Sequence, residues 1–191
     1  MNPLLRAGLA TALLLAAAMA AAQPRAERLA VCGGCHGADG ISAIAGTPSL
    51  AGQPKVFIEN QLVIMREGLR DVPAMKPFVA GLTDDEIVAL AVHYAAQPPK
   101  ALAPPPKPEL ARAGGELAQR LGCGTCHLPT YAGQQQVPRL AGQDEAYLSQ
   151  AMKQFRDHPG PGRDTIMAAT LRGLGDRELE QLAHHLAYAR P

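Results

Sequence analysis

Two short motifs in the chain carry residues that could perform redox chemistry. Residues 32–36 (Cys-Gly-Gly-Cys-His) and 123–127 (Cys-Gly-Thr-Cys-His) share one spacing, and they contain all four cysteines of the chain. Two thiols three positions apart can bond to the two vinyl groups of one porphyrin, and the adjacent imidazole can bind its iron. The motifs therefore predict two covalently bound haem c groups. The predicted attachment residues and proximal iron ligands are Cys32, Cys35, His36, Cys123, Cys126 and His127.

Other uses of paired cysteines fit this spacing less well. A disulfide framework does not require the histidine that directly follows each pair. The pairs lie 91 positions apart, far beyond the ligand spacing of a zinc ribbon. Thioredoxin-type chemistry needs a βαβ context that the surrounding sequence lacks. Haem attachment is the interpretation that the spacing favours.

The first 22 residues have the pattern of an export signal. Arg6 supplies a positive charge, residues 9–22 are apolar apart from Thr11, and residues 20–22 are three alanines, as signal peptidase requires. The apolar run is shorter than the roughly 20 residues that span a bilayer, although an uncleaved anchor is the alternative. We expect cleavage near Ala22 and a periplasmic protein with at most peripheral membrane association.

The composition limits both the partners and the core. With 18 basic and 17 acidic residues, the chain has no basic stripe, which excludes nucleic acid as a partner. Aromatic residues make up 4% of the chain, and tryptophan is absent, although aromatics normally dominate core burial. Small domains with so little core usually need a metal or another staple. We expect the haems to complete the cores, and the haem-free chain to fold poorly.

A tandem repeat organises the chain. Residues 48–53 (PSLAGQ) match residues 138–143 (PRLAGQ) at an offset of 90, and the cysteine motifs match at 91. The proline-rich segment 98–108 between the copies is typical of an extended linker. The sequence thus predicts a signal peptide over 1–22, a domain over 23–97, a linker over 98–108 and a second domain over 109–191.

The elements of each copy are predicted to be helical. Positions 58, 62 and 65, and the matching positions 148, 152 and 155, are apolar with the spacing of a buried helix face. Thr83 and Glu86 form a capping-box pattern at the start of another helix. Sustained alternation typical of strands is not found. The predicted fold class is all-α, with two tandem domains, each wrapped around one covalent haem.

Methionines are the predicted sixth ligands of the irons. Met75 and Met167 form the only matched methionine pair of the two copies, each in a polar, loop-like segment seven residues before a matched leucine. Met65 and Met152 align with other bulky residues, so we expect them to fill the core.

Histidine ligation is the alternative. His93 and His185 also match between the copies. At 100° per residue, however, His93 lies roughly 110° from the apolar face of its helix, which points it to the flank or to solvent. His158 and His184 have no counterpart in the other copy and are expected to be solvated.

Pro48 and Pro138 occupy matching places, twelve and eleven residues after the motif histidines. An iron-bound imidazole normally donates its second ring N–H to a carbonyl or carboxylate. We expect the two proline carbonyls to accept these bonds, although a role in a turn is an alternative that is compatible with it.

The order of these motifs resembles the cytochrome c4 family of periplasmic dihaem electron carriers. The resemblance rests on Cys-x-x-Cys-His-Gly at residues 32–37, Pro-x-Leu-Ala-Gly-Gln, a methionine segment and a final helix, duplicated across a proline-rich linker. It implies two tandem cytochrome c-like domains, each wrapped around one covalent haem, and His/Met ligation of both irons. It also implies electron delivery toward a membrane terminal oxidase, with a quinol–cytochrome c reductase as donor. The second copy departs in having Leu128 where the first has Gly37, and a longer loop over 156–163.

Three functions are compatible with two haem sites. Electron transfer without substrate chemistry is favoured, since two six-coordinate irons leave no open position for a substrate, and the protein would then not be an enzyme. The alternative is an electron-transfer subunit of a periplasmic dehydrogenase such as a flavocytochrome, which would copurify with a catalytic chain. A dihaem peroxidase would require one iron to lose its sixth ligand, and methionine at both sites argues against it.

Overall fold

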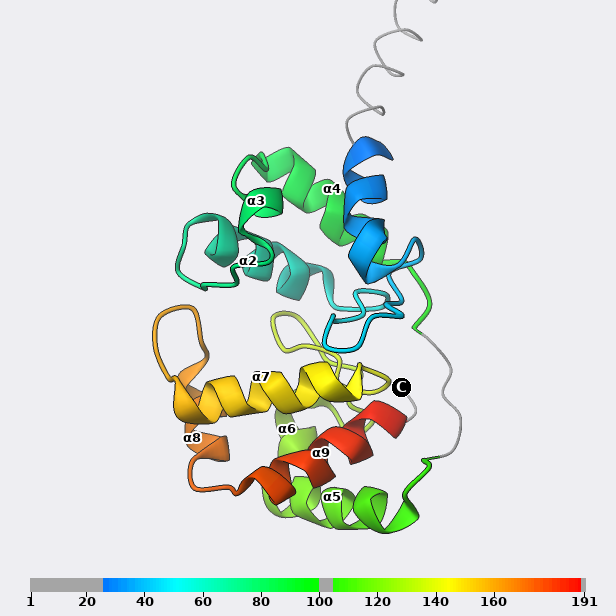
Figure 1. Ribbon diagram of the computed structural model, residues 1–191, viewed down its shortest axis with the longest axis vertical. Coiled ribbons are helices and arrows are strands. Elements are labelled where there is room, and N and C mark those ends of the chain that lie inside the picture. Colours follow the sequence, from blue (N-terminus) through cyan, green and yellow to red (C-terminus); the bar gives the residue numbers. More distant parts are fainter. Residues whose placement is uncertain (1–25, 100–104, 190–191) are drawn as a thin grey trace, which may run out of the picture.

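The computed structural model describes residues 26–99 and 105–189. Helices form nearly all the regular structure of these ranges, and the one β-type contact there is an isolated bridge between Gln134 and Val137. Figure 1 shows two helical domains stacked on each other. The all-α, two-domain prediction is confirmed. The predicted signal peptide and residues 100–104 of the predicted linker lie outside the described residues.

The first domain begins with helical residues 26–36, which end at the first cysteine motif. It continues with α2 (Lys55–Arg66), α3 (Lys76–Val79) and α4 (Asp84–Ala95). The capping box predicted at α4 is present, because the Glu86 N–H donates to Thr83 Oγ1 at 3.2 Å and the Thr83 N–H donates to the Glu86 carboxylate at 2.9 Å. Local sequence therefore determines where α4 begins.

The second domain repeats this order of elements. It consists of α5 (Pro108–Arg120), α6 (Cys123–His127), α7 (Glu145–Asp157), α8 (Thr165–Leu171) and α9 (Asp176–Tyr188). α5 begins at the last residue of the predicted linker. Between α5 and the motif helix α6, Gly122 takes a left-handed φ of 68°, whereas in the first domain one continuous helix runs into the motif.

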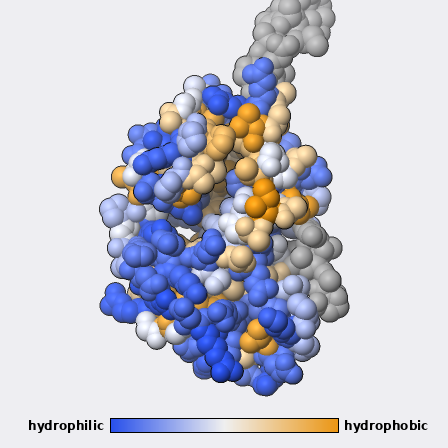
Figure 2. Space-filling view, viewed as in Figure 1, coloured by the Kyte–Doolittle hydropathy of each residue, from blue (hydrophilic) through white to orange (hydrophobic). Residues whose placement is uncertain are grey.

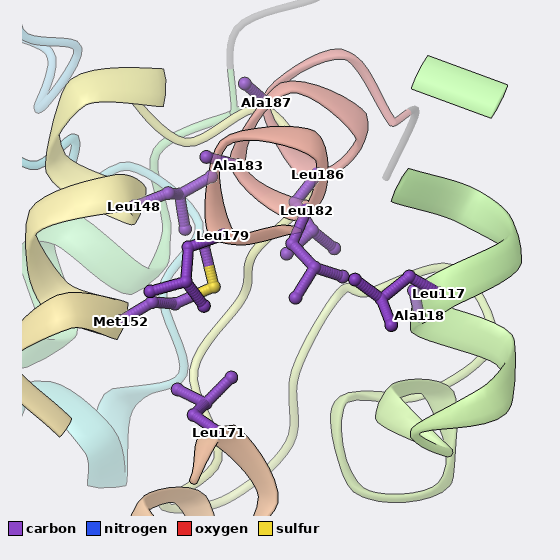
Figure 3. Packing of buried hydrophobic residues seen from close by; sticks show 10 residues of the cluster. All are labelled: Leu117, Ala118, Leu148, Met152, Leu171, Leu179, Leu182, Ala183, Leu186 and Ala187. Carbon is purple, nitrogen blue, oxygen red and sulfur yellow. The ribbon is translucent and has the colours of Figure 1, made fainter. Parts of the chain in front are cut away.

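Each domain has an apolar core of its own. The first core consists of Ile58, Val79, Leu82, Ile87, Leu90, Ala91 and Tyr94. The second, shown in Figure 3, consists of Leu117, Ala118, Leu148, Met152, Leu171, Leu179, Leu182, Ala183, Leu186 and Ala187. Met65 packs against the first core and Met152 lies within the second, which agrees with the packing role predicted for both.

The two domains differ in their surfaces. On the face seen in Figure 2, apolar side chains gather on the first domain, while the second domain is mainly hydrophilic. Exposed large apolar residues of the first domain are Val31, Ile44, Val56, Leu69, Phe78, Val88 and Val92, whereas the second contributes Ile166. In residues 26–99 and 105–189, none of the helices has the length and apolar character needed to cross a bilayer.

Candidate functional site

The four motif cysteines are free thiols in two different environments. In each motif the second cysteine, Cys35 or Cys126, is exposed, and the first, Cys32 or Cys123, is half-buried. Cys32 and Cys123 pack against the apolar cores of their domains. Burial raises the pKa of both of these thiols. Each motif thus presents one thiol at the core and one at the surface. A group that is attached to both thiols would fill the space between them.

The motif histidines are buried and oriented by proline carbonyls. His36 Nδ1 lies 2.8 Å from the Pro48 carbonyl oxygen, and His127 Nδ1 lies 2.8 Å from that of Pro138. A carbonyl only accepts, so Nδ1 carries the hydrogen, and Nε2 keeps a free lone pair that can bind a metal. The predicted proline acceptors are confirmed. Burial lowers the pKa of His36 and of His127, which favours the neutral imidazole that metal binding needs.

The two candidate methionines lie against the same cores as the cysteines. Met75, directly before α3, packs with Cys32 on the first core. Met167 packs with Cys123 on the second. Met167 differs from the prediction in lying within the first turn of α8, because the Asp164 carboxylate caps that helix and accepts from the Met167 N–H at 2.9 Å. The structure therefore places the predicted Cys and Met of each copy on one core.

The rival histidines of the last helices have other partners. His93 is half-buried, and its ring meets Tyr94 edge-on with centroids 5.0 Å apart. His185 Nδ1 lies 3.1 Å from the Ala111 carbonyl oxygen of α5, and its ring meets Tyr131 edge-on. These contacts place both rings in packing contacts of α4 and α9 with neighbouring residues.

One histidine prediction was wrong. His184 is 1% exposed, and its Nδ1 lies 3.1 Å from Glu145 Oε1. The physical reason is that α9 packs against both α5 and α7, so it buries two faces rather than one. His158, at the end of α7, is exposed as predicted.

The backbone after the second motif is strained. Leu128 has φ 68° and ψ 157°, a region that glycine occupies without cost and that costs other residues about 1–3 kcal/mol. Its counterpart Gly37 also has a positive φ, of 84°. The second copy thus keeps the left-handed backbone of the first without glycine, directly beside His127.

Arg139 is a buried cation at the boundary of the domains. It is 2% exposed, and its guanidinium donates to the carbonyls of Ala51, at 2.8 Å, and of Ala141. Burial lowers the pKa of Arg139 to about 10, so the side chain is charged at neutral pH. Its Nε has no hydrogen-bond partner, and among the described residues no carboxylate forms an ion pair with it.

A haem group fits these residues. An uncompensated buried cation is costly, and the propionate carboxylates of a haem would satisfy the charge of Arg139. Among residues 26–99 and 105–189, the Tyr94 hydroxyl is a second buried hydrogen-bond donor without a partner. Two covalently held haems would offer carboxylates to these hydrogen-bond donors and an iron to the free Nε2 of each motif histidine.

Three residues near the domain boundary have structural roles that the sequence motifs did not predict. Gln53, Gln143 and Arg139 are all buried, and all three form hydrogen bonds between the domains. The recurrence of the final glutamine in both Pro-x-Leu-Ala-Gly-Gln segments is the signal that could have identified the two glutamines. Nothing comparable marks Arg139, since its counterpart is Ser49.

Known families match both halves of the chain. Residues 19–93 match the family described as "Cytochrome C oxidase, cbb3-type, subunit III". Residues 111–189 match the family described as "Cytochrome c". The match of each copy to a cytochrome family agrees with the duplicated haem motif.

Curated relatives and a solved structure match over most of the chain. Cytochrome c4 of Pseudomonas aeruginosa is 29% identical over 97% of this chain and 98% of its own length. Cytochrome c4 of Thiocapsa roseopersicina is 34% identical over 82% and 85%. A thiosulfate dehydrogenase electron acceptor of Stutzerimonas stutzeri is 33% identical over 82% and 77%. The structure of reduced recombinant cytochrome c4 from Pseudomonas stutzeri has a TM-score of 0.78 and 27% identity, covering 88% of this chain and 98% of that one.

Proposed function

The chain belongs to the cytochrome c4 family of electron carriers, and from this we propose that it holds two haem c groups and carries electrons in the periplasm. Its donor would be a quinol-oxidising complex and its acceptor a membrane terminal oxidase. The proposal includes export by the segment 1–22, with cleavage near Ala22, and two haem domains at 23–97 and 109–191 joined by the linker 98–108.

One observation carries the assignment of the irons. In both domains the motif histidine commits Nδ1 to a proline carbonyl at 2.8 Å and keeps Nε2 free, while the matched methionine lies on the core that the motif cysteine contacts. This duplication supports His36 with Met75 as ligands of one iron, and His127 with Met167 as ligands of the other. Cys32 and Cys35, and Cys123 and Cys126, would form the thioether bonds.

The residues of the chain have three tasks in this function. A haem bound in each domain would supply a one-electron ferric/ferrous couple. The proline carbonyls fix the tautomer and ring orientation of the histidines. The methionine thioethers, as iron ligands, would favour the ferrous state more than a second histidine would, and they would leave no open coordination position for a substrate. The cores of both domains keep water away from the buried side of the site.

A second candidate function follows from the relatives. A thiosulfate dehydrogenase electron acceptor is 33% identical to this chain, which lies between the 29% and 34% of the two cytochrome c4 relatives. The chain could therefore serve a periplasmic dehydrogenase as its electron acceptor or as its haem subunit. A stable complex with a catalytic chain on purification from the native host would favour this candidate, and purification as a separate protein would favour the carrier.

Redox titration of the purified holoprotein with visible spectra tests the proposal. We expect two haems per chain, two one-electron steps, and a thioether-to-ferric-iron charge-transfer band from each haem. A single haem, or a spectrum without that band in the oxidised protein, would contradict the ligand assignment.

Methionine replacement tests the ligands individually. Met75→His and Met167→His should each abolish the charge-transfer band of one haem. Each should also lower the potential of that haem by on the order of a tenth of a volt or more, within the roughly 0.8 V range that axial ligands span. The matched controls are Met65→Leu and Met152→Leu, which should keep both bands and cost less than about 1.5 kcal/mol of stability. Survival of both bands in both histidine variants would refute the assignment.

A further inference from the structure

Two glutamines at equivalent places in the repeat join the domains. Gln143 Oε1 accepts from the Ser49 N–H at 2.7 Å, and Gln143 Nε2 donates to the Ser49 carbonyl at 2.9 Å. Gln53 bonds Arg139 in the same way: its Oε1 accepts from the Arg139 N–H, and its Nε2 donates to the Arg139 carbonyl, both at 2.9 Å. The contact is reciprocal, because each domain offers one amide side chain and one backbone residue to the other.

These bonds are buried and held in place. The exposed fractions of the four residues are 6% for Ser49, 3% for Gln53, 2% for Arg139 and 4% for Gln143. The N–H of each glutamine is also bonded within its own domain, to the carbonyl of Leu50 or Leu140, at 3.1 Å in both cases. Hydrogen bonds in such a dry setting are strong, and losing one partner leaves a buried group unsatisfied. The two amides are therefore fixed parts of the domain interface.

The peptide groups that the glutamines touch are the ones that hold the motif histidines. The Pro48–Ser49 peptide accepts from His36 through its carbonyl at 2.8 Å and donates through its N–H to Gln143. The Pro138–Arg139 peptide accepts from His127 at 2.8 Å and donates to Gln53. Each motif histidine is thus linked, through a single peptide group, to a glutamine of the opposite domain.

We infer that the glutamines act as crossed positioning residues: Gln143 tunes the haem held by His36, and Gln53 tunes the haem held by His127. A peptide that donates through its N–H becomes a stronger acceptor at its carbonyl, because hydrogen bonds in a chain polarise one another. A stronger bond at Nδ1 makes Nε2 a more basic ligand, which stabilises the ferric iron. The inference rests on the proposed haem function, and it adds that each domain sets part of the potential of the other.

The test is Gln143→Met in the holoprotein, which keeps a side chain of similar length. It removes both amide bonds to Ser49 and the bond that the amide oxygen accepts from the Asp144 N–H. The reduction equilibrium constant of the haem held by His36 should rise by about two- to fivefold, the scale of one hydrogen bond, where tenfold is about 59 mV for a one-electron couple. The other potential should stay unchanged. Gln53→Met should give the mirror result. Redox titration measures both, and Met75→His identifies the first haem by lowering its potential.

Two controls distinguish tuning of the haem potential from a general loosening of the domain interface. Gln143→Glu keeps an oxygen toward the Ser49 N–H, so the potential of the first haem should stay at or below the wild-type value. Asp144→Ala removes another bond between the domains, from the Gly46 N–H to Asp144 Oδ1 at 2.8 Å, without touching either peptide. It also removes the N-cap of α7, from the Tyr147 N–H to the same oxygen at 2.7 Å. It should leave both potentials unchanged. Hydrogen exchange of the Ser49 amide should accelerate in Gln143→Met and stay slow in Asp144→Ala.

The inference requires that each glutamine variant shifts the potential of the haem in the opposite domain. A shift of the haem in the same domain as the mutated glutamine, an equal shift of both haems, or no shift in a folded holoprotein would overturn it. Failure of the proposed function would appear already in the wild type, as a haem count other than two or missing charge-transfer bands. If Gln143→Met does not yield holoprotein, Gln53→Met tests the same pattern from the other side.

Discussion

At the scale of single residues, Arg139 is the least expected feature of the molecule. It follows the proline that holds His127, its guanidinium reaches the backbone of both domains, and its Nε is buried without a partner. Its charge persists at neutral pH although burial lowers its pKa to about 10. A buried cation favours the reduced form of a nearby redox group, since that form carries one positive charge less.

Neutralising Arg139 should therefore lower the potential of the haem held by His127. We expect Arg139→Met to lower it by on the order of 1 kcal/mol, or about 40 mV, as measured by redox titration. Arg139→Lys keeps the charge and should retain most of the potential. Equal potentials in the methionine and lysine variants would show that the charge of Arg139 does not act on this haem.

At the scale of elements, the second domain depends on the close crossing of α5 and α9. A Cβ at Gly114 would overlap the Gln181 carbonyl oxygen and lie 2.7 Å from His185 Cβ. At the neighbouring Gly115, a Cβ would meet only the ring of His185, at 3.0 Å or more. Glycine at 114 is thus required for the backbones to approach, whereas glycine at 115 only lowers the helix propensity of α5.

The two glycines should respond differently to alanine. Gly114→Ala should destabilise the second domain by about 1–3 kcal/mol, because overpacking forces the two helices apart. Gly115→Ala should cost less, since the bulk it adds is offset by a gain in helix propensity of up to about 1 kcal/mol. Thermal unfolding followed by circular dichroism compares the two. Equal losses of stability in the two variants would show that glycine at position 114 is not required for the close approach of α5 and α9.

At the scale of the whole molecule, two small cores share one polar interface. The buried apolar cluster of the first domain has seven members. Four of them lie on the single helix α4, and two, Val79 and Ala91, are no larger than valine. A domain of this size is only marginally stabilised by the surface that it buries, so a covalently held porphyrin would supply the rest of the core. Loss of haem should then unfold the domain that held it.

Removing one attachment site tests this dependence. Cys123→Ser with Cys126→Ser should leave one haem per chain and reduce the helical circular dichroism signal by roughly half, because the second domain loses its staple. The first haem should remain bound by Cys32 and Cys35, although its potential would change if Gln143 no longer reaches Ser49. Full helicity in this single-haem variant would disprove the requirement for haem.

Much of this protein follows from local and repeated sequence. The cysteine motifs, the matched Met75 and Met167, and the capping box at Thr83 are recognisable because each depends on a short spacing that recurs or has a known geometry. The proline carbonyls could be predicted because an iron-bound imidazole needs an acceptor, and Pro48 and Pro138 stand at matching distances. The duplication itself determines the number of domains and predicts one haem site in each.

Tertiary structure alone decided which residues of the two copies contact each other. Whether His184 is buried depends on α9 packing against two helices at once, and its spacing in the sequence does not show this. The bonds from Gln53 and Gln143 join residues 86 and 94 positions apart, and no periodicity specifies such a pairing. It arises when the domains dock with equivalent turns face to face, because only then does each amide meet the peptide that holds the histidine of the other domain.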